Sequence, residues 1–236
     1  SATCLVTRCT TMMASDIESS IPARRAFVAH CSALVWLAAA GAGAPVHAQG
    51  ARRTLLVVGD SLSAEYGIAR GSGWVALLEQ RIAQQKLPVR VVNASISGDT
   101  TSGGRSRLPA LLQQHRPQVV VVALGGNDAL RGLPLDMTEA NLTAMARAAK
   151  AAGAKVLIAG IAVPPNYGRK YSEDFARLFG TVARAEGTAL VPFLLAGVAD
   201  APNADALFQP DRIHPTAAAH PQMLDNVWPV LRPLLR

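Results

Sequence analysis

The residue types of a nucleophilic hydrolase occur in this chain at two widely separated places. Ser61 follows an apolar run and lies in the short polar segment 59–63, whereas Asp211 and His214 lie near the carboxyl terminus. A serine is a weak nucleophile at neutral pH unless a base takes its proton, and the base works best when a third group orients it. Ser61, His214 and Asp211 supply these parts, so the sequence predicts a catalytic set of nucleophile, base and orienting carboxylate.

Two further segments could stabilise the oxyanion that acyl transfer creates. One contains Gly98 and the other contains Asn127, and each follows an apolar run. The expected donors of this oxyanion hole are the N–H of Gly98, the side-chain amide of Asn127 and the N–H of Ser61. Plainer interpretations exist, because Gly, Asp and Ser suit turns, Asn can bond within its own loop, and Asp211 with His214 could be a surface pair. The joint occurrence of all the parts favours catalysis.

The elements that must position these residues are short β-branched runs alternating with segments of helical periodicity. This pattern is typical of a parallel sheet covered by helices, and right-handed crossovers leave few strand orders. We predict a flavodoxin-like three-layer α/β/α sandwich whose five-stranded parallel sheet has the order 2-1-3-4-5. The predicted strands are 54–58, 89–93, 119–124, 155–161 and 189–191. The predicted helices include 74–82, 108–112, 138–152 and 172–186, and the last begins near Pro215.

The predicted fold brings the chemical residues together. In such a sheet, ligands bind beyond the carboxyl ends of the strands, where the strand order reverses. Ser61, Gly98 and Asn127 follow the first, second and third predicted strands, and His214 precedes the last helix. We therefore expect all four segments to meet at one rim of the sheet.

Residues 1–48 have the composition of a leader. Two arginines precede an apolar run from 26 to 44, and small residues follow it up to Ala48. This pattern predicts a secretory signal peptide that is cut after Ala48, which leaves a single domain of residues 49–236 in the periplasm or outside the cell. An uncleaved membrane anchor is the alternative, and it is disfavoured because polar residues and many Ala and Gly interrupt the run.

Composition excludes several other classes. Half of the residues are hydrophobic and 17% are charged, which is typical of a globular domain with one substantial core. All three cysteines lie in the leader, so the mature chain offers no thiol nucleophile or disulfide. The basic residues behind the net charge of +7 are scattered singly, which disfavours a nucleic-acid surface.

The histidines outside the leader disfavour a metal-dependent hydrolase. They are His115, His214 and His220, and no two have the spacing of a zinc motif, so we expect no metal. His115 is expected to be solvated at a helix end, where its charge would suit the helix dipole. His220 is expected to have a surface or packing role rather than a catalytic one.

The blocks around Ser61, Gly98, Asn127 and His214 resemble the four blocks of the SGNH (GDSL) hydrolase superfamily. The chain is similar to its bacterial thioesterase I, lysophospholipase and arylesterase branch over essentially the whole mature sequence. Further segments that carry the likeness are 92–100, 107–112, 125–132 and 165–169. The resemblance implies a periplasmic hydrolase of acyl esters and thioesters, such as acyl-CoA, lysophospholipid and aryl esters, that needs no cofactor.

Two residues depart from the pattern of the superfamily. Glu65 lies where many relatives carry a small residue, and Arg212 replaces the usual glycine between Asp211 and His214. Both leave the catalytic set intact and bear on the substrate range. Two alternatives remain open, a carbohydrate deacetylase with the same machinery and a flavodoxin-like binding module for flavin or a phosphoryl group. We further expect a monomer that makes transient contact with lipid or a membrane surface.

Overall fold

The computed structural model describes residues 52–163 and 165–236. The leader predicted for residues 1–48, which contains every cysteine of the chain, lies outside the described residues. Within the described ranges, no helix combines the length and the apolar character that crossing a membrane requires.

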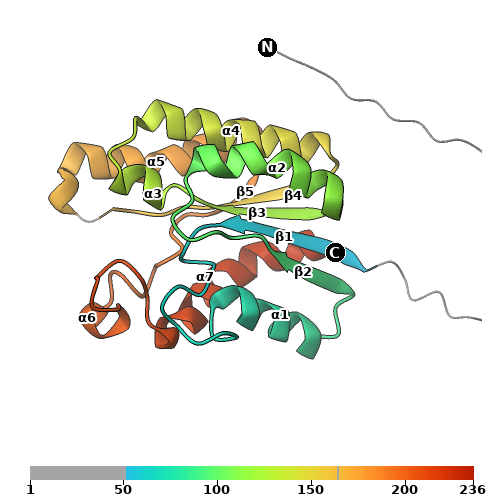
Figure 1. Cartoon of the computed structure of the whole chain (residues 1–236), viewed down its shortest axis with the longest axis horizontal. Helices are drawn as coiled ribbons and strands as arrows, with labels where there is room; N and C mark the ends of the chain where they lie inside the picture. The colour runs from blue at the N-terminus through green and yellow to red at the C-terminus, as the bar shows by residue number, and fades with distance from the viewer. Residues whose placement is uncertain (1–51, 164) are drawn as a thin grey trace, which may run out of the picture. The chain divides into compact units, whose positions relative to one another are not determined.

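One sheet of five parallel strands forms the centre of the described fold, and its order β2-β1-β3-β4-β5 confirms the prediction (Figure 1). The strands are β1 (Arg53–Gly59), β2 (Val89–Asn93), β3 (Val119–Ala123), β4 (Lys155–Ala159) and β5 (Ala189–Val191). The side chains from Leu55 to Val58 and from Val119 to Val122 are at most 1% exposed. Burial on both faces of the sheet is the reason why β1 and β3 are almost continuously apolar.

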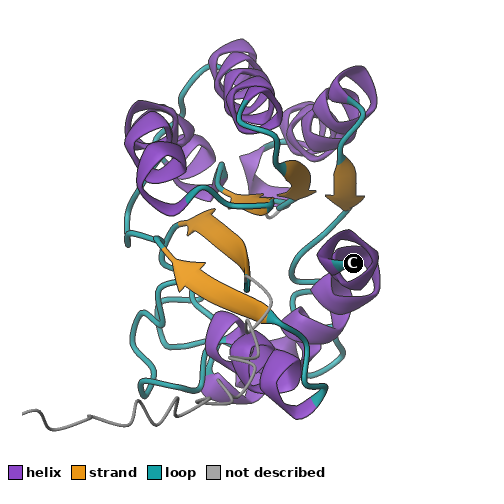
Figure 2. Ribbon diagram, turned by 90° about the vertical axis from the view of Figure 1, so that its right-hand side faces the viewer, coloured by secondary structure: helices purple, strands orange, loops and turns teal. Residues whose placement is uncertain are grey.

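Helices cover both faces of the sheet, which confirms the three-layer sandwich (Figures 1 and 2). One layer contains α2 (Thr101–His115), α4 (Leu135–Ala151) and α5 (Arg169–Glu186), and the other contains α1 (Trp74–Gln84) and α7 (His220–Leu231). Contacts of α4 with both α2 and α5 join the first layer, and contacts between α1 and α7 join the second.

The last long helix begins later than the sequence predicts. α7 starts at His220 rather than near Pro215, because Pro215 pairs with Phe208 in an antiparallel bridge. The N–H of Gln209 also donates to the carbonyl of His214 at 2.8 Å. Residues 207–216 therefore form a hairpin-like loop, which we call the histidine loop, and the predicted start of the last helix near Pro215 is wrong.

In the described part of the chain, five short helices add to the predicted elements. They are α3 (Gly126–Leu130), α6 (Ala204–Leu207) and the 3-10 helices η1 (Pro165–Tyr167), η2 (Ala217–Ala219) and η3 (Arg232–Leu235). Two of them, η2 and η3, lie within the range of the predicted last helix. β4 also ends earlier than predicted, at Ala159. The backbone packs closely just beyond it, since a Cβ at Gly160 would lie 2.4 Å from the carbonyl oxygen of Pro192. α3 and α6 lie toward the carboxyl ends of the strands, the edge at which the site residues are expected (Figure 1).

Candidate active site

Three side chains predicted to act together form a hydrogen-bonded row beyond β1. The Oγ of Ser61 lies 2.8 Å from Nε2 of His214, and Nδ1 of His214 lies 2.6 Å from Oδ2 of Asp211. Ser61 follows β1 by two residues, whereas the other two belong to the histidine loop. In this arrangement Nε2 can take a proton from Ser61 while the carboxylate holds Nδ1–H and so fixes the tautomer of the ring.

The turn of the histidine loop fixes Asp211 as an ionised acceptor. Its Oδ1 accepts hydrogen bonds from the N–H groups of Ile213, at 2.9 Å, and His214, at 3.0 Å. Burial raises the pKa of Asp211, but these backbone bonds and the bond from the His214 ring outweigh it and lower the pKa to about 2. Arg212 adopts φ 56° in this turn, a left-handed conformation that costs a non-glycine residue about 1–2 kcal/mol.

The side chain of Glu65 forms two hydrogen bonds across the loop between Ser61 and α1. Its Oε1 accepts hydrogen bonds from the N–H of Gly71, at 2.8 Å, and from the N–H of Gly73, at 2.9 Å. Gly73 is the N-cap residue of α1 and has no side chain of its own to cap the helix. Glu65 itself has φ 59°. Glu65, which departs from the superfamily pattern, therefore caps α1 from outside the helix. The same side chain orders the loop that carries Ser61.

Two residues that sequence reasoning missed hold the histidine loop against the Ser61 loop. The ring of Tyr66 packs on the ring of His214 with centroids 4.3 Å apart. The Nε2 of Gln209 donates to the carbonyls of Tyr66, at 2.9 Å, and Pro215, at 3.0 Å. Neither residue type signals catalysis, so no sequence pattern pointed to them. Together they keep the His214 ring beside Ser61.

His220 has the packing role that the sequence favoured. It is 2% exposed, and its Nδ1 accepts the backbone N–H of Trp74 at 3.0 Å. Burial lowers the pKa of His220 to about 4, although the charge of Glu65 opposes this shift. The Trp74 indole in turn donates to Oγ of Ser63 at 3.1 Å. His220 therefore supports the loop of Ser61 from α7, and His115 is the last residue of α2, at the predicted helix end.

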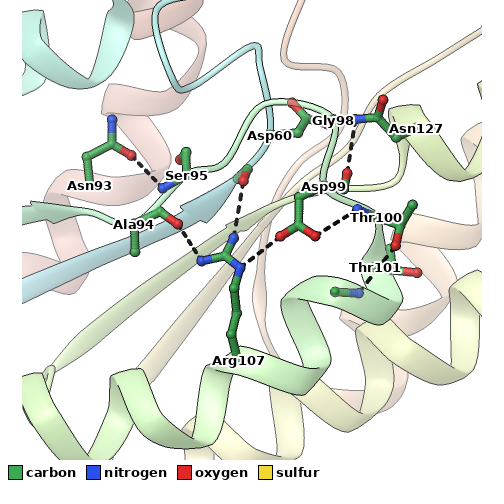
Figure 3. Close-up of polar contacts among 12 residues, drawn as sticks. Asp60, Asn93, Ala94, Ser95, Gly98, Asp99, Thr100, Thr101, Arg107 and Asn127 are labelled. Carbon is green, nitrogen blue, oxygen red and sulfur yellow. Dashed lines mark hydrogen bonds and ion pairs between the residues drawn. The ribbon is translucent and has the colours of Figure 1, made fainter.

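Asn127 is joined to the segments that precede Ser61 and follow Gly98. Its Nδ2 donates to the carbonyl of Asp99 at 3.0 Å and to Oδ2 of Asp60 at 3.3 Å (Figure 3). The amide nitrogen therefore already has two acceptors, which the sequence alone did not indicate. A substrate oxyanion can use Asn127 as a donor only by sharing or replacing the longer bond to Asp60.

The two backbone donors predicted for the oxyanion hole are not engaged. Among the described residues, no hydrogen bond is donated by the N–H of Ser61 or by the N–H of Gly98. Gly98 has φ 79°, so the glycine at this position permits a left-handed turn. Its carbonyl accepts from Nη2 of Arg131 at 2.8 Å, which ties it to the end of α3.

Asp60, the residue before the predicted nucleophile, is a buried carboxyl group. It is 3% exposed, and its Oδ1 accepts the N–H of Leu62 at 3.0 Å. Burial raises the pKa of Asp60 to about 6, although the bond from Leu62 and the charge of His214 oppose the shift. Desolvation of the ionised form is the cause, because too few donors replace the lost water.

The side chain of Asp128 connects α3 to the start of α2 by hydrogen bonds. This fully buried carboxylate accepts the N–H of Thr101 at 2.9 Å, the hydroxyl of the same residue, and the hydroxyl of Thr138 at 3.3 Å. The N-terminus of a helix favours such a negative charge. Asn127, the neighbour of Asp128, is therefore held at a fixed position relative to the segment that contains Gly98.

A parallel sheet of this order, with a serine, histidine and aspartate row beyond its central strand, defines an α/β/α hydrolase of the SGNH type. A family model described as the GDSL-like Lipase/Acylhydrolase family matches residues 57–221, which is more than half of the chain. The chain belongs to this family. The resemblance found in the sequence is thereby confirmed, and a non-enzymatic binding module is no longer an alternative.

The chain is similar to characterised hydrolases over most of its length. Esterase TesA of Pseudomonas aeruginosa is 55% identical over 79% of this chain and 92% of the relative. Thioesterase 1/protease 1/lysophospholipase L1 of Escherichia coli K12 is 43% identical over 77% of this chain and 85% of the relative. A crystal structure of TesA superposes with a TM-score of 0.74 at 55% identity and covers 77% of this chain and 99% of the solved chain.

The described residues contain no group of three or more His, Cys, Asp or Glu side chains that could hold a metal ion. The residues predicted for the site nevertheless form one connected set. His214 bonds to both Ser61 and Asp211, and Asn127 bonds to Asp60, the residue that precedes Ser61. The chemistry of these groups is proton transfer and hydrogen-bond donation.

Proposed function

We propose that this chain is an exported serine hydrolase that cleaves acyl esters and thioesters through a covalent acyl-enzyme. The observation that carries the proposal is the unbroken row in which Ser61 Oγ lies 2.8 Å from His214 Nε2 and His214 Nδ1 lies 2.6 Å from Asp211 Oδ2. Ser61 is the nucleophile, His214 is the general base, and Asp211 orients and stabilises the charged ring.

Acylation transfers the acyl group from the substrate to the serine. His214 takes the proton of Ser61 as Oγ attacks the acyl carbon, and the carbonyl oxygen becomes an oxyanion. The free N–H groups of Ser61 and Gly98 and the amide of Asn127 donate to this oxyanion. When the tetrahedral intermediate collapses, the bond to the alcohol or thiol breaks and His214 returns its proton to that leaving group.

Deacylation repeats the same steps with water. His214 accepts a proton from a water molecule, which attacks the acyl carbon of the acyl-enzyme. Collapse of the second tetrahedral intermediate breaks the bond to Ser61 Oγ, which recovers its proton from His214. The products are a carboxylic acid and the free enzyme, so the cycle requires no cofactor and consumes one water.

The substrate class rests on the relatives. The similar proteins are named esterase TesA and thioesterase 1/protease 1/lysophospholipase L1, and the matches cover three quarters of this chain or more. We infer that acyl-CoA, lysophospholipid and aryl esters are substrates here, and that the protein acts as a monomer with transient contact to lipid. The exposed side chains of Tyr66, Ile96 and Ile213, on the segments that carry the site, provide apolar surface for such acyl groups.

The decisive test of function is hydrolysis by the purified mature protein with and without Ser61. We expect wild-type protein to hydrolyse p-nitrophenyl esters and acyl-CoA thioesters, and Ser61→Ala to lose this turnover while it keeps the circular dichroism and melting temperature of the wild type. Near-normal turnover by Ser61→Ala would contradict the mechanism. If acetylated xylan were the one substrate hydrolysed efficiently, the result would favour a carbohydrate deacetylase instead.

Export can be tested separately from hydrolysis. Expression of the full chain in a Gram-negative host should give a periplasmic protein whose amino-terminal residue is Gln49, because the charge pattern, apolar run and small residues before it direct cleavage there. Amino-terminal sequencing of the periplasmic fraction measures this. A full-length chain recovered from the membrane fraction would instead support the uncleaved anchor.

A further inference from the structure

One arginine of α2 reaches two backbone carbonyls and one carboxylate behind the site. The guanidinium of Arg107 donates from Nε to Oδ2 of Asp99 at 2.8 Å, from Nη1 to the carbonyl of Ala94, and from Nη2 to the carbonyl of Gly59 at 3.3 Å (Figure 3). The side chains of Arg107 and Asp99 are 20% and 12% exposed, so the ion pair is largely shielded from water. Shielding strengthens charged hydrogen bonds compared with those on the surface.

Each acceptor of Arg107 belongs to a segment that carries part of the proposed machinery. Gly59 is the last residue of β1 and precedes Ser61 by two residues. Ala94 follows β2 and begins the segment 94–100, which contains Gly98 and which we call the oxyanion loop. Asp99 follows Gly98 directly, and its carbonyl accepts the amide of Asn127 at 3.0 Å. The guanidinium therefore joins the nucleophile segment to the oxyanion loop.

The carboxylate of Asp99 connects Arg107 to the backbone of the oxyanion loop. Its Oδ1 accepts the N–H of Thr100 at 3.0 Å while Oδ2 is held by Arg107. A Cβ at Gly103 would lie 1.9 Å from Oδ1, so the glycine at that position leaves room for the carboxylate. With both oxygens fixed, the main chain of Asp99 has little freedom to rotate. Its carbonyl thus keeps its direction toward Asn127.

We propose that Arg107 is a positioning residue that sets the distance between Ser61 and the oxyanion donors Gly98 and Asn127. This inference rests on the proposed function, because it assigns Arg107 a role in transition-state stabilisation without contact to the substrate. Rate enhancement from an oxyanion hole depends on donors fixed in advance, so a loosened loop lowers kcat and leaves substrate binding almost unchanged.

Arginine suits this role better than lysine. Its planar fork presents several N–H donors in fixed directions, and here three of its nitrogens meet three different acceptors. A lysine ammonium could keep the ion pair with Asp99 but could not reach both carbonyls in the same geometry. The proposal therefore predicts a graded response, in which Arg107→Lys loses less rate than Arg107→Met.

The experiment is a double-mutant cycle with Asn127, in which kcat and KM for p-nitrophenyl butyrate are measured per active site. We expect Arg107→Met to lower kcat about 10- to 100-fold with KM within about threefold of wild type, since a displaced donor costs less than the loss of one. In the Asn127→Ala background the same change should lower kcat at most about fivefold, because one of the donors that it positions is already gone.

The controls separate positioning from folding. Titration of Ser61 to completion with a p-nitrophenyl phosphonate counts the reactive sites in each preparation. Arg81→Met is the matched control, because Arg81 lies on α1 and pairs with Asp225 of α7 at 2.8 Å, away from the oxyanion loop. Asp99→Asn keeps the carbonyl that binds Asn127 and removes the charge that binds Arg107, so it tests the link if Arg107→Met does not fold.

The outcomes distinguish a failure of the positioning role of Arg107 from a failure of the proposed function. A kcat of Arg107→Met within about twofold of Arg81→Met, or an equal loss with and without Asn127, would overturn the positioning role. Activity retained by Ser61→Ala would instead overturn the proposed function itself, whatever Arg107 does. Loss of kcat that is partly recovered in Arg107→Lys, and that shrinks in the Asn127→Ala background, supports the inference.

Discussion

At the scale of single residues, burial and hydrogen bonding give the carboxyl groups around Ser61 opposite properties. Asp211 receives two backbone N–H bonds and the His214 ring, and although burial opposes the shift, its pKa falls to about 2. Asp60 is more deeply buried, and desolvation raises its pKa to about 6. The first group is therefore a permanent anion suited to orient a base, whereas the second is an acceptor whose charge depends on pH.

The base and its orienting carboxylate should differ in how much activity they support. We expect His214→Ala to lower kcat/KM by about 10⁴–10⁶, and Asp211→Ala to lower it less, by about 10²–10⁴, because a partly misoriented ring can still take a proton. Steady-state kinetics on an aryl ester, corrected for folded protein, measures both effects. The Tyr66 contact with the ring, at 4.3 Å between centroids, helps to retain its position without Asp211.

His220→Ala is the matched control for this pair. It removes the acceptor of the buried Trp74 N–H, so we expect a lower melting temperature and a change in kcat/KM of less than about tenfold. An inactive His220→Ala beside an active His214→Ala would show that the base had been assigned to the wrong histidine.

At the scale of elements, close packing of α2 against its neighbours positions the oxyanion loop that precedes it. A Cβ on Gly104 of α2 would lie 2.2 Å from Cδ1 of Leu124 and 3.2 Å from Sδ of Met145, a residue of α4. Both neighbours are at most 2% exposed and have little room to move. Glycine therefore allows α2 to approach α4 and Leu124, the residue after β3, closely, which the sequence pattern of the helix does not reveal.

Two helical glycines should respond in opposite directions to alanine. Gly104→Ala overpacks the layer and should lower the free energy of unfolding by about 1–3 kcal/mol. Gly180→Ala in α5 should raise it by about 0.5–1 kcal/mol, because a Cβ there would meet its nearest atoms at 3.7 and 3.8 Å and alanine is the better helix former. Urea denaturation of both variants measures the difference. Equal effects of the same sign would contradict the packing difference.

At the scale of the whole molecule, buried charge should make stability depend on pH in a predictable direction. The pKa of Asp60 rises from 3.8 when exposed to about 6 when folded, so its ionised form destabilises the fold above pH 6. This destabilisation is relieved as the pH falls through about 6 toward 3.8. Asp211 acts in the other direction at lower pH, since its stabilisation is fully present above 3.8 and is lost as the pH falls through about 2.

Comparison of Asp60→Asn with wild type isolates the buried charge. The amide changes the unfolding free energy by an amount that does not depend on pH. The difference in unfolding free energy, Asp60→Asn minus wild type, should therefore decrease by about 2–3 kcal/mol as the pH is lowered from 8 to 4.5. Chemical denaturation at several pH values measures this difference. A difference that does not change with pH would mean that Asp60 has the same pKa in the folded and the unfolded protein.

The strand order and the candidate site residues could be predicted from short stretches of sequence. Burial on both faces makes β1 and β3 continuously apolar, and helical periodicity separates the strands, so both signals lie within short windows. The chain order of Ser61, Gly98, Asn127 and His214, each following a strand or preceding the last helix, was enough to place them at one rim. These features could be predicted because they depend on residue type and local spacing.

The way these residues are held depends on contacts between distant parts of the chain. Pro215 favours a helix start by its local propensity, but its pairing with Phe208 makes the histidine loop a hairpin instead. The bond from Arg107 to the carbonyl of Gly59 joins residues 48 positions apart, and the bond from Asn127 to Asp60 joins residues 67 positions apart. Such contacts have no local sequence signal, because they exist only once the crossovers of the sheet have brought distant loops to the same edge.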